Sequence, residues 1–371
     1  MSRSVFAQSK RLIVKVGSSS LAQPSGGLDP HRLAALANVV ADATLSGRQV
    51  VLVTSGAVAG AMGPLGLAGR PKDLATQQAA ASVGQGALML AYSKVFQERG
   101  LLVGQVLLTA EDVIKRSHYR NAQRTLYRLM ELGVVPIVNE NDTVATDELR
   151  FGDNDRLAAL VAHLVHAEAL ILLSDVDGLY TSSPTTPGAR LISDVHTASQ
   201  IDQISVSAKG SSMGSGGMRT KVVAALMAAD AGIPALVAGA DDAAAALAGE
   251  SVGTQFHAAK KRMSTRLLWL AHAATPAGSL TLDPGAVEAV ANRRKSLLPA
   301  GISQVSGDFN AGDPVDLLDE SGGIVARGLV NFDSTELPGL LGRTTQDLAR
   351  ELGSAYRREV VHRDGLVVLK T

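Results

Sequence analysis

Residues 12–20 read LIVKVGSSS, an apolar run that ends in a turn of small residues. Five more apolar runs follow before residue 257, and longer stretches with apolar residues at helical spacing separate them. We expect six strands, at residues 12–16, 49–54, 102–108, 134–138, 169–174 and 234–238. Several are apolar on both faces, as buried parallel strands are, and their alternation with helices predicts a doubly wound α/β sheet.

The expected helices have recognisable ends. Asp29 followed by Pro30 is typical of an N-cap with proline in the first turn, and Gly47 is typical of a helix end. We expect the first helix between them and further helices at residues 75–99, 117–132, 156–166 and 218–231. These helices would cover the two faces of the sheet.

The helical pattern stops near residue 276. Residues 256–266 are rich in basic side chains, and short strand-like runs follow at residues 279–282, 315–318 and 324–330, the last two joined by a hairpin loop. We therefore expect a domain at residues 1–257, a basic linker at 258–276 and a small β-rich domain at 277–371.

The composition excludes several classes of protein. The 35 basic and 35 acidic residues give a net charge of zero, which argues against a dedicated nucleic-acid or membrane-surface protein. The absence of cysteine excludes disulfides, thiolate metal sites and cysteine nucleophiles. The first residues form no apolar leader, and glycines interrupt the uncharged window at residues 50–69. We expect a cytoplasmic protein without a membrane span that binds a small ligand.

Two lysines lie beside glycine-rich turns. Lys15 precedes the small residues 17–20, and Lys221 ends the segment GSGGMRTK at residues 214–221, which enters a helix. Backbone N–H groups there can approach a phosphate, although the first segment alone is more typical of a surface lysine and the second is equally typical of a flexible linker. The chain has only 11 lysines. This pair suggests phosphoryl transfer, because cations on both sides would neutralise the attacking and leaving oxygens.

Polar side chains follow three other expected strands. Ser55 can help to bind a carboxylate or simply cap the next helix. The sequences NEND at residues 139–142 and FGDND at 151–155 can hold an ammonium, orient lysines or coordinate a cation, while a solvated loop is the alternative for some of their acids. Ser174 and Asp175 end the fifth strand, where a nucleotide could lie.

In this order the motifs resemble those of the amino acid kinase family, and residues 277–371 resemble a PUA domain. The resemblance implies an αβα sandwich with a mostly parallel central sheet. It implies ATP at one side of the sheet edge, L-glutamate at the other, and transfer of the γ-phosphoryl group to the glutamate side-chain carboxylate, the first step of proline synthesis from glutamate. The motifs lie at residues 14–18, 53–57, 138–142, 151–155, 173–175, 177–180 and 216–221.

The resemblance also implies roles for single residues. Lys15 and Lys221 would flank the transferred group, and Asp155 would hold both lysines. Glutamate binding falls to Ser55, Asp142 and Asn154. ATP binding falls to Lys15, Ser174, Asp175, Ser215, Gly216, Gly217, Met218, Arg219, Thr220 and Lys221. The chain departs from the family pattern at Ser183, where we expect aspartate, and this weakens any expectation about the nucleotide contacts of that loop.

ATP and Mg²⁺ are the expected cofactors, yet the sequence names no metal ligand. Asp153, Asp155 and Asp175 are candidates, and positioning lysines is an equally good role for them. The resemblance further implies feedback inhibition by proline, a homo-oligomer, and handover of the product to glutamyl phosphate reductase. We assign the basic residues around the linker to contacts between domains or subunits rather than to RNA binding by the PUA domain.

Two other functions stay open. The nearest is a kinase of the same fold that acts on N-acetylglutamate, aspartate, carbamate or UMP, although the C-terminal domain and the two acid–amide motifs argue against it. The other is an RNA-binding or RNA-modifying protein with an inactive kinase fold. Salt-dependent RNA binding would identify that second function.

Overall fold

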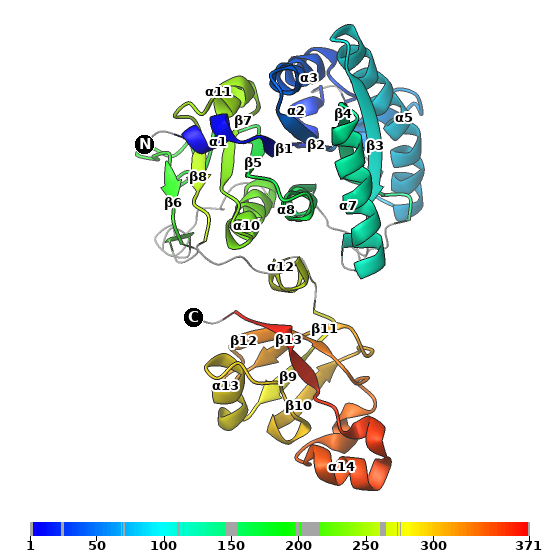
Figure 1. Cartoon of the computed structure of the whole chain (residues 1–371), viewed down its shortest axis with the longest axis vertical. Coiled ribbons are helices and arrows are strands. Elements are labelled where there is room, and N and C mark those ends of the chain that lie inside the picture. The colour runs from blue at the N-terminus through cyan, green and yellow to red at the C-terminus, as the bar shows by residue number, and fades with distance from the viewer. Residues whose placement is uncertain are drawn as a thin grey trace. The chain divides into compact units, whose positions relative to one another are not determined.

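The chain folds into two compact units, Met1–Thr265 and Arg266–Thr371 (Figure 1). The computed structural model describes residues 3–23, 26–67, 69, 71–109, 112–113, 115–144, 154–197, 200–201, 216–259, 265–272, 274 and 276–369. Within these residues, no helix combines the length and the apolar character that crossing a membrane requires.

An eight-stranded sheet forms the centre of the N-terminal unit, in the order β3-β4-β2-β1-β5-β7-β8-β6. Neighbouring strands are parallel except β7 and β8, which are antiparallel. All six expected strands are confirmed with ends shifted by at most two residues, whereas the short β6 and β8 were not expected. The strands are β1 Arg11–Val16, β2 Gln49–Thr54, β3 Leu102–Leu108, β4 Val134–Glu140, β5 Ala169–Ser174, β6 Asp194–Val195, β7 Ala235–Gly239 and β8 Thr254–Phe256.

Helices cover both faces of this sheet, which confirms the expected αβα sandwich (Figure 1). One layer contains α1 (Ser4–Gln8), α3 (Pro30–Leu45), α5 (Leu74–Glu98) and α11 (Ala243–Ala248). The opposite layer contains α7 (Arg116–Glu131), α8 (Asn154–Leu164) and α10 (Gly216–Asp230). The five expected helices are all present. Short helices α2 (Ser18–Leu21) and α4 (Ala57–Ala61) follow the ends of β1 and β2.

Strand alternation decides which layer each β1 side chain meets. Leu12, Val14 and Val16 belong to the buried cluster that includes side chains of α3 and α5. Because successive side chains point to opposite faces, Ile13 and Lys15 face the layer of α8 and α10. Both faces are covered, so five of the six β1 residues are buried, and the strand is apolar except for Arg11 at its start and Lys15.

Local capping explains where α3 and α4 begin. The Asp29 side chain accepts hydrogen bonds from the backbone N–H groups of His31 and Arg32 at 2.9 and 3.2 Å, as expected for an N-cap before Pro30. Gly56 caps α4 with a φ of 107°, a left-handed conformation that favours glycine. This glycine turns the chain sharply at the end of β2.

Helices α4 and α5 approach each other at two glycines. A Cβ atom placed on Gly84 would lie 1.7 Å from the carbonyl oxygen of Ala57, and one on Gly60 would lie 2.8 Å from the carbonyl oxygen of Gly84. Only hydrogen fits at these positions. The close contact brings the middle of α5 against the helix that follows β2.

The C-terminal unit contains a second sheet of five strands, in the order β10-β9-β11-β12-β13. The three expected strands and the hairpin between β11 and β12 are confirmed. Strands β10 and β13 were not expected, because their outward side chains are polar and only one face is covered. The elements are β9 Gly278–Leu282, α13 Pro284–Ala291, β10 Ile302–Gly307, β11 Pro314–Leu318, β12 Ile324–Val330, α14 Thr345–Leu352 and β13 Val361–Val368.

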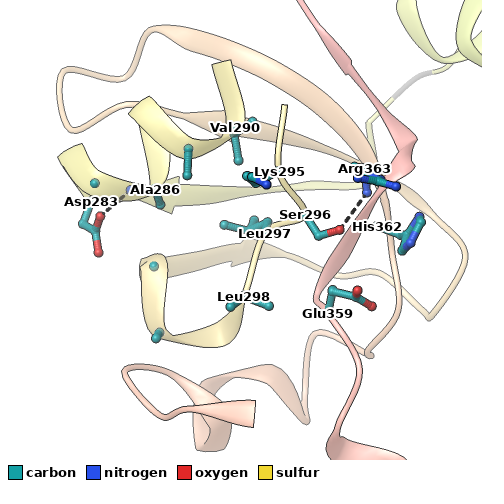
Figure 2. Close-up of a pocket in the computed structure, with 14 residues that line it drawn as sticks. Asp283, Ala286, Val290, Lys295, Ser296, Leu297, Leu298, Glu359, His362 and Arg363 are labelled. Atoms are coloured by element: carbon teal, nitrogen blue, oxygen red, sulfur yellow. Dashed lines mark hydrogen bonds between the residues drawn. The ribbon is translucent and has the colours of Figure 1, made fainter. Parts of the chain in front are cut away.

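Arg327 ties the start of this unit to its sheet. The guanidinium donates to Asp316 Oδ1 at 2.7 Å and to the Ala274 carbonyl oxygen at 2.8 Å, just after helix α12 (Thr265–His272). The unit also holds a pocket of about 810 Å³ between α13 and β13 (Figure 2). Its lining combines apolar side chains such as Leu297 with the charged Lys295.

Candidate active site

The ends of β1, β2 and β5 lie level at one edge of the N-terminal sheet. Val16 pairs with Thr54 of β2 and with Leu173 of β5. The residues that follow these three strands therefore lie side by side. Asn139 of β4 comes directly after Val138, which pairs with Val53. Parallel strands place ligand-binding residues at this carboxyl edge.

Asp155 lies between two lysines. Its Oδ1 is 2.5 Å from Nζ of Lys15, and its Oδ2 is 3.1 Å from Nζ of Lys221. The exposed fractions of Lys15, Asp155 and Lys221 are 1, 0 and 7%. Among the described residues, this cluster combines one carboxylate with two ammonium groups. Its excess of positive charge at a buried position attracts an anion.

The first turn of α10 supports this lysine cluster. Thr220 Oγ1 lies 3.1 Å from Asp155 Oδ2 and 2.9 Å from the carbonyl oxygen of Gly217, so its hydroxyl has two acceptors within reach. Lys221 follows directly. The helix start therefore fixes Lys221 and Asp155 relative to each other, and a helix N-terminus also favours negative charge.

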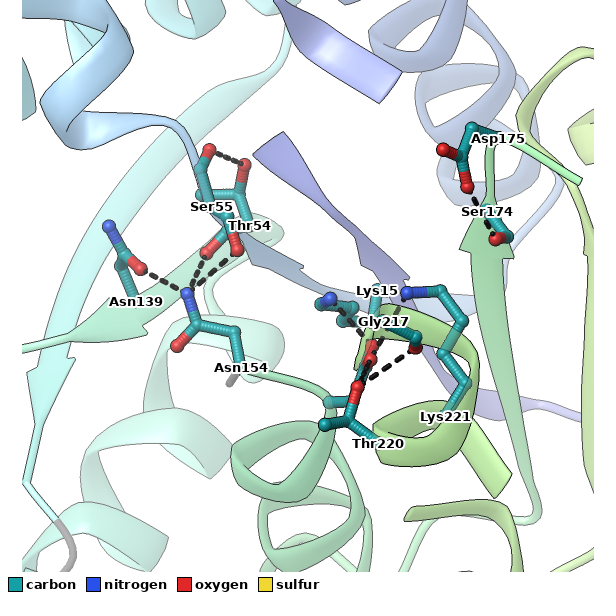
Figure 3. A network of polar contacts seen from close by, with 11 residues as sticks. Lys15, Thr54, Ser55, Asn139, Asn154, Ser174, Asp175, Gly217, Thr220 and Lys221 are labelled. Carbon is teal, nitrogen blue, oxygen red and sulfur yellow. Dashed lines mark hydrogen bonds and ion pairs between the residues drawn. The ribbon is translucent and has the colours of Figure 1, made fainter. Parts of the chain in front are cut away.

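A second cluster surrounds the side-chain amide of Asn154. Its Nδ2 lies 2.7 Å from Asn139 Oδ1, 2.9 Å from Ser55 Oγ and 2.9 Å from the Thr54 carbonyl oxygen (Figure 3). Its Oδ1 is buried and has no hydrogen-bond partner within the described residues. Asn154 thus keeps an acceptor that a ligand donor could use.

Helix α5 supports the Asn154 cluster from behind. Gln85 Oε1 accepts a hydrogen bond from Asn139 Nδ2 at 2.7 Å, and the Tyr92 hydroxyl lies 2.9 Å from Thr54 Oγ1. Burial raises the pKa of Tyr92, so this hydroxyl stays neutral. Sequence reasoning missed both residues. The available signal was Gln85 itself, a polar residue between two glycines in an otherwise small and apolar part of the helix.

The remaining glutamate- and ATP-site candidates lie in three places. Ser174 and Asp175 form a pair at the end of β5, where the Ser174 hydroxyl donates to Asp175 Oδ1 at 3.1 Å (Figure 3). Asp142 is half-buried in the turn after β4. Gly216, Gly217, Met218 and Arg219 form the start of α10, and Ser215 lies outside the described residues.

No ready-made metal centre exists in the part of the chain that the structure describes. These residues contain no group of three or more histidine, aspartate or glutamate side chains able to hold an ion. Asp155 has one lysine on each carboxylate oxygen, which fits lysine positioning better than metal binding. Asp175 is exposed at the end of β5, and Asp153 lies outside the described residues.

Residues 10–239 match the family model described as the amino acid kinase family. The chain belongs to this family. Residues 278–352 match the PUA domain. Both findings confirm the resemblance read from the motifs.

Other members of the amino acid kinase family are similar over almost the whole chain. A protein of Streptomyces avermitilis named glutamate 5-kinase is 58% identical over 370 residues, which is 99% of both chains. One of Salinispora arenicola with the same name is 59% identical over 361 residues, covering 97% of this chain and 98% of the other. One of Bifidobacterium longum is 53% identical over 368 residues, covering 99 and 98%.

A solved structure shows the same amino acid kinase fold. Carbamate kinase from Giardia lamblia bound to AMP-PNP superposes with a TM-score of 0.51 at 17% identity. The match covers 68% of this chain and all of the carbamate kinase. At this identity the similarity concerns the fold alone.

Proposed function

We propose that this protein is a glutamate 5-kinase. It transfers the γ-phosphoryl group of ATP to the side-chain carboxylate of L-glutamate and releases L-glutamyl 5-phosphate and ADP. The observation that carries this proposal is the identity of 53 to 59%, over nearly complete chains, to relatives named glutamate 5-kinase. The product is the first intermediate on the way from glutamate to proline.

The lysine cluster suits this reaction. The attacking carboxylate has an ordinary pKa of about 4.3 and is ionised at pH 7, so no general base is needed. One of its oxygens forms a bond to the γ-phosphorus while the bond to the β–γ bridging oxygen breaks. Lys15 and Lys221 stabilise the charge that develops on the transferring group and on the departing ADP, and Asp155 keeps both ammonium groups in place.

The Asn154 cluster suits the acceptor. Ser55, Asp142 and Asn154 bind L-glutamate, with the buried Oδ1 of Asn154 accepting a hydrogen bond from its ammonium group. ATP lies at the other side of Asp155. Its phosphates face the start of α10, and its nucleoside lies near the Ser174–Asp175 pair at the end of β5.

Mg²⁺ accompanies ATP in this proposal. The described residues offer no cluster of three ligands, so the ion is held mainly by phosphate oxygens, with Asp175 as the exposed carboxylate within the proposed ATP site. Its contribution is to neutralise charge on those oxygens. ADP formation that persists in excess chelator would contradict this requirement.

Trapping with hydroxylamine tests the reaction directly. An acyl phosphate reacts with hydroxylamine to give a hydroxamate and free phosphate, and added iron(III) turns the hydroxamate into a coloured complex. L-Glutamate is compared with N-acetyl-L-glutamate and L-aspartate in the presence of ATP and Mg²⁺. We expect signal with L-glutamate alone. Signal only with another acid would overturn the substrate, and silence with all three would favour carbamate, UMP or an RNA-binding function.

Proline inhibition and self-association rest on the resemblance to the family. We propose that proline competes at the glutamate pocket and that the chain forms a homo-oligomer through its kinase domain. Unchanged affinity for L-glutamate in saturating proline would contradict the first. A monomer mass by light scattering at micromolar concentration would contradict the second.

Cellular location and product handover complete the proposal. We propose a cytoplasmic enzyme whose product passes to glutamyl phosphate reductase, because an acyl phosphate hydrolyses readily in water. Release of free product before reduction would contradict the handover. The basic residues around the linker serve contacts between domains or subunits, and tight, salt-dependent RNA binding would overturn that assignment.

A further inference from the structure

The Asn154 cluster continues into α5 beyond the residues that the proposed function uses. Gln85 is 9% exposed, and its Oε1 accepts a hydrogen bond of 2.7 Å from Nδ2 of Asn139. Asn139 is 2% exposed, and its Oδ1 accepts one of 2.7 Å from Nδ2 of Asn154. The three side-chain amides form a continuous chain, which we call the amide relay.

The amide relay has one direction. A side-chain amide has a donor end and an acceptor end. Gln85 presents its acceptor to Asn139, so Asn139 turns its own oxygen toward Asn154. The backbone N–H of Glu140 donates to that same oxygen at 2.9 Å and holds it in this orientation. Asn154 must then turn its donor inward, and its Oδ1 is left as the free end.

The free end is a buried acceptor without a partner. At the other end of the relay, Gln85 Nε2 is a buried donor that also lacks a partner within the described residues. A buried polar atom without a hydrogen bond is costly and rare in native proteins, and a bound ligand or water is one way to satisfy it. An ammonium group carries only donors, so it matches an oxygen and not an amide nitrogen.

The backbone holds Gln85 in place. Its neighbour Gly84 packs against the carbonyl oxygen of Ala57, where a Cβ atom would lie only 1.7 Å away. This contact fixes the position of Gln85 on α5 relative to α4, the helix that follows β2. The packing of α5 against α4 thus sets the position of Gln85, the first residue of the amide relay, whether or not a substrate is bound.

We propose that Gln85 is a positioning residue that acts through Asn139 to keep the carbonyl oxygen of Asn154 toward the acceptor substrate, and so selects carboxylic acids that carry an ammonium group. This inference rests on the proposed function. Without Gln85, the Asn139 amide loses the acceptor of its Nδ2, and only the Glu140 backbone N–H and Asn154 still orient it. Asn154 keeps its hydrogen bonds to Ser55 and to the Thr54 carbonyl oxygen but is held less firmly on the side of Asn139. Its Oδ1 is then less well placed for an ammonium group, which matters little to an acid without one.

The test compares two acids that differ only in the amine. ADP release is measured with L-glutamate and with glutarate for the wild-type protein, for Gln85→Met, for Asn139→Leu and for the double variant. The control is Gln97→Met, an exposed glutamine near the end of the same helix. Circular dichroism checks that each variant folds. If one of the two single variants does not fold, the other alone is sufficient for the test.

We expect each single variant to lower the preference for L-glutamate over glutarate, as a ratio of kcat/KM, by about tenfold or more. The change should appear mainly in the KM of L-glutamate, and the double variant should lose no more than the larger single effect because both act on one chain of bonds. Gln97→Met should keep the wild-type ratio.

Equal losses with both acids, an unchanged ratio, or additive effects in the double variant would overturn the relay. These outcomes differ from failure of the proposed function. If the wild-type protein phosphorylates a different amino acid, the proposed substrate is wrong, and the same ratio against that acid's amine-free counterpart tests the relay. A wild-type protein inactive with every amino acid would overturn both.

Discussion

Asn154 and Asp155 are consecutive residues whose side chains belong to two different polar clusters. Nδ2 of Asn154 lies 2.7 Å from Asn139 Oδ1 (Figure 3), while Oδ1 of Asp155 lies 2.5 Å from Nζ of Lys15. Successive helical residues point about 100° apart, so the start of α8 directs one side chain toward β2 and β4 and the next toward β1 and α10. The proposed acceptor and phosphoryl sites therefore adjoin at a single helix start.

Removing either lysine should reduce turnover far more than binding. Lys15→Ala and Lys221→Ala each remove one of two buried ammonium groups, and the loss of one preorganised charge lowers kcat by about 100- to 1000-fold. Steady-state ADP release measures this loss. Lys10→Ala, an exposed lysine just before β1, is the control and should retain activity. Near-normal turnover in either variant would refute the assigned role.

Asp155 should be important for stability as well as for catalysis. Asp155→Asn keeps the shape but removes the carboxylate between two buried ammonium groups, and breaking a buried ion pair on one side costs about 3–5 kcal/mol. Urea unfolding at pH 7 measures the change. The exposed Asp175→Asn should stay within about 0.5 kcal/mol of wild type. An unchanged midpoint for Asp155→Asn would show that the two lysines do not need its charge.

Gly217 tests where the ATP phosphates lie. A Cβ atom on Gly217 meets nothing within 4 Å, so Gly217→Ala leaves the protein folded, yet the methyl group would obstruct phosphates at the start of α10. We expect the KM for ATP to rise by at least about tenfold, or about 1.4 kcal/mol, with the KM for L-glutamate unchanged. Gly86→Ala, also in open space but on α5, should change neither constant.

Gly84 and Gly86 should respond oppositely to the same substitution. Gly84→Ala places a methyl group against the Ala57 carbonyl oxygen and should destabilise the protein by about 1–3 kcal/mol or more. Gly86→Ala adds a methyl group on an exposed helix face and should stabilise it by about 0.5–1 kcal/mol. The urea unfolding midpoints of Gly84→Ala, Gly86→Ala and the wild-type protein, measured under the same conditions, test this difference. Equal midpoints would mean that α4 and α5 can separate at little cost.

Local sequence patterns determined most of the secondary structure. The apolar run at β1, the Asp29 cap of α3 and the turn glycine at position 47 each act over a few residues, so they are legible without the fold. The same holds for the order of motifs that indicated the family. Strands β10 and β13 were missed because exposed polar residues such as Arg363 interrupt their apolar pattern.

Tertiary structure alone decided which side chains meet. The sequence named Lys15, Asp155 and Lys221 as candidates, but only the level ends of the strands and the starts of α8 and α10 place them within contact distance. It gave no sign of what Gln85 contacts, because a hydrogen bond across 54 sequence positions depends on how α5 packs against α4. Periodicity and capping are properties of neighbouring residues, whereas a buried polar network forms only where separate elements converge.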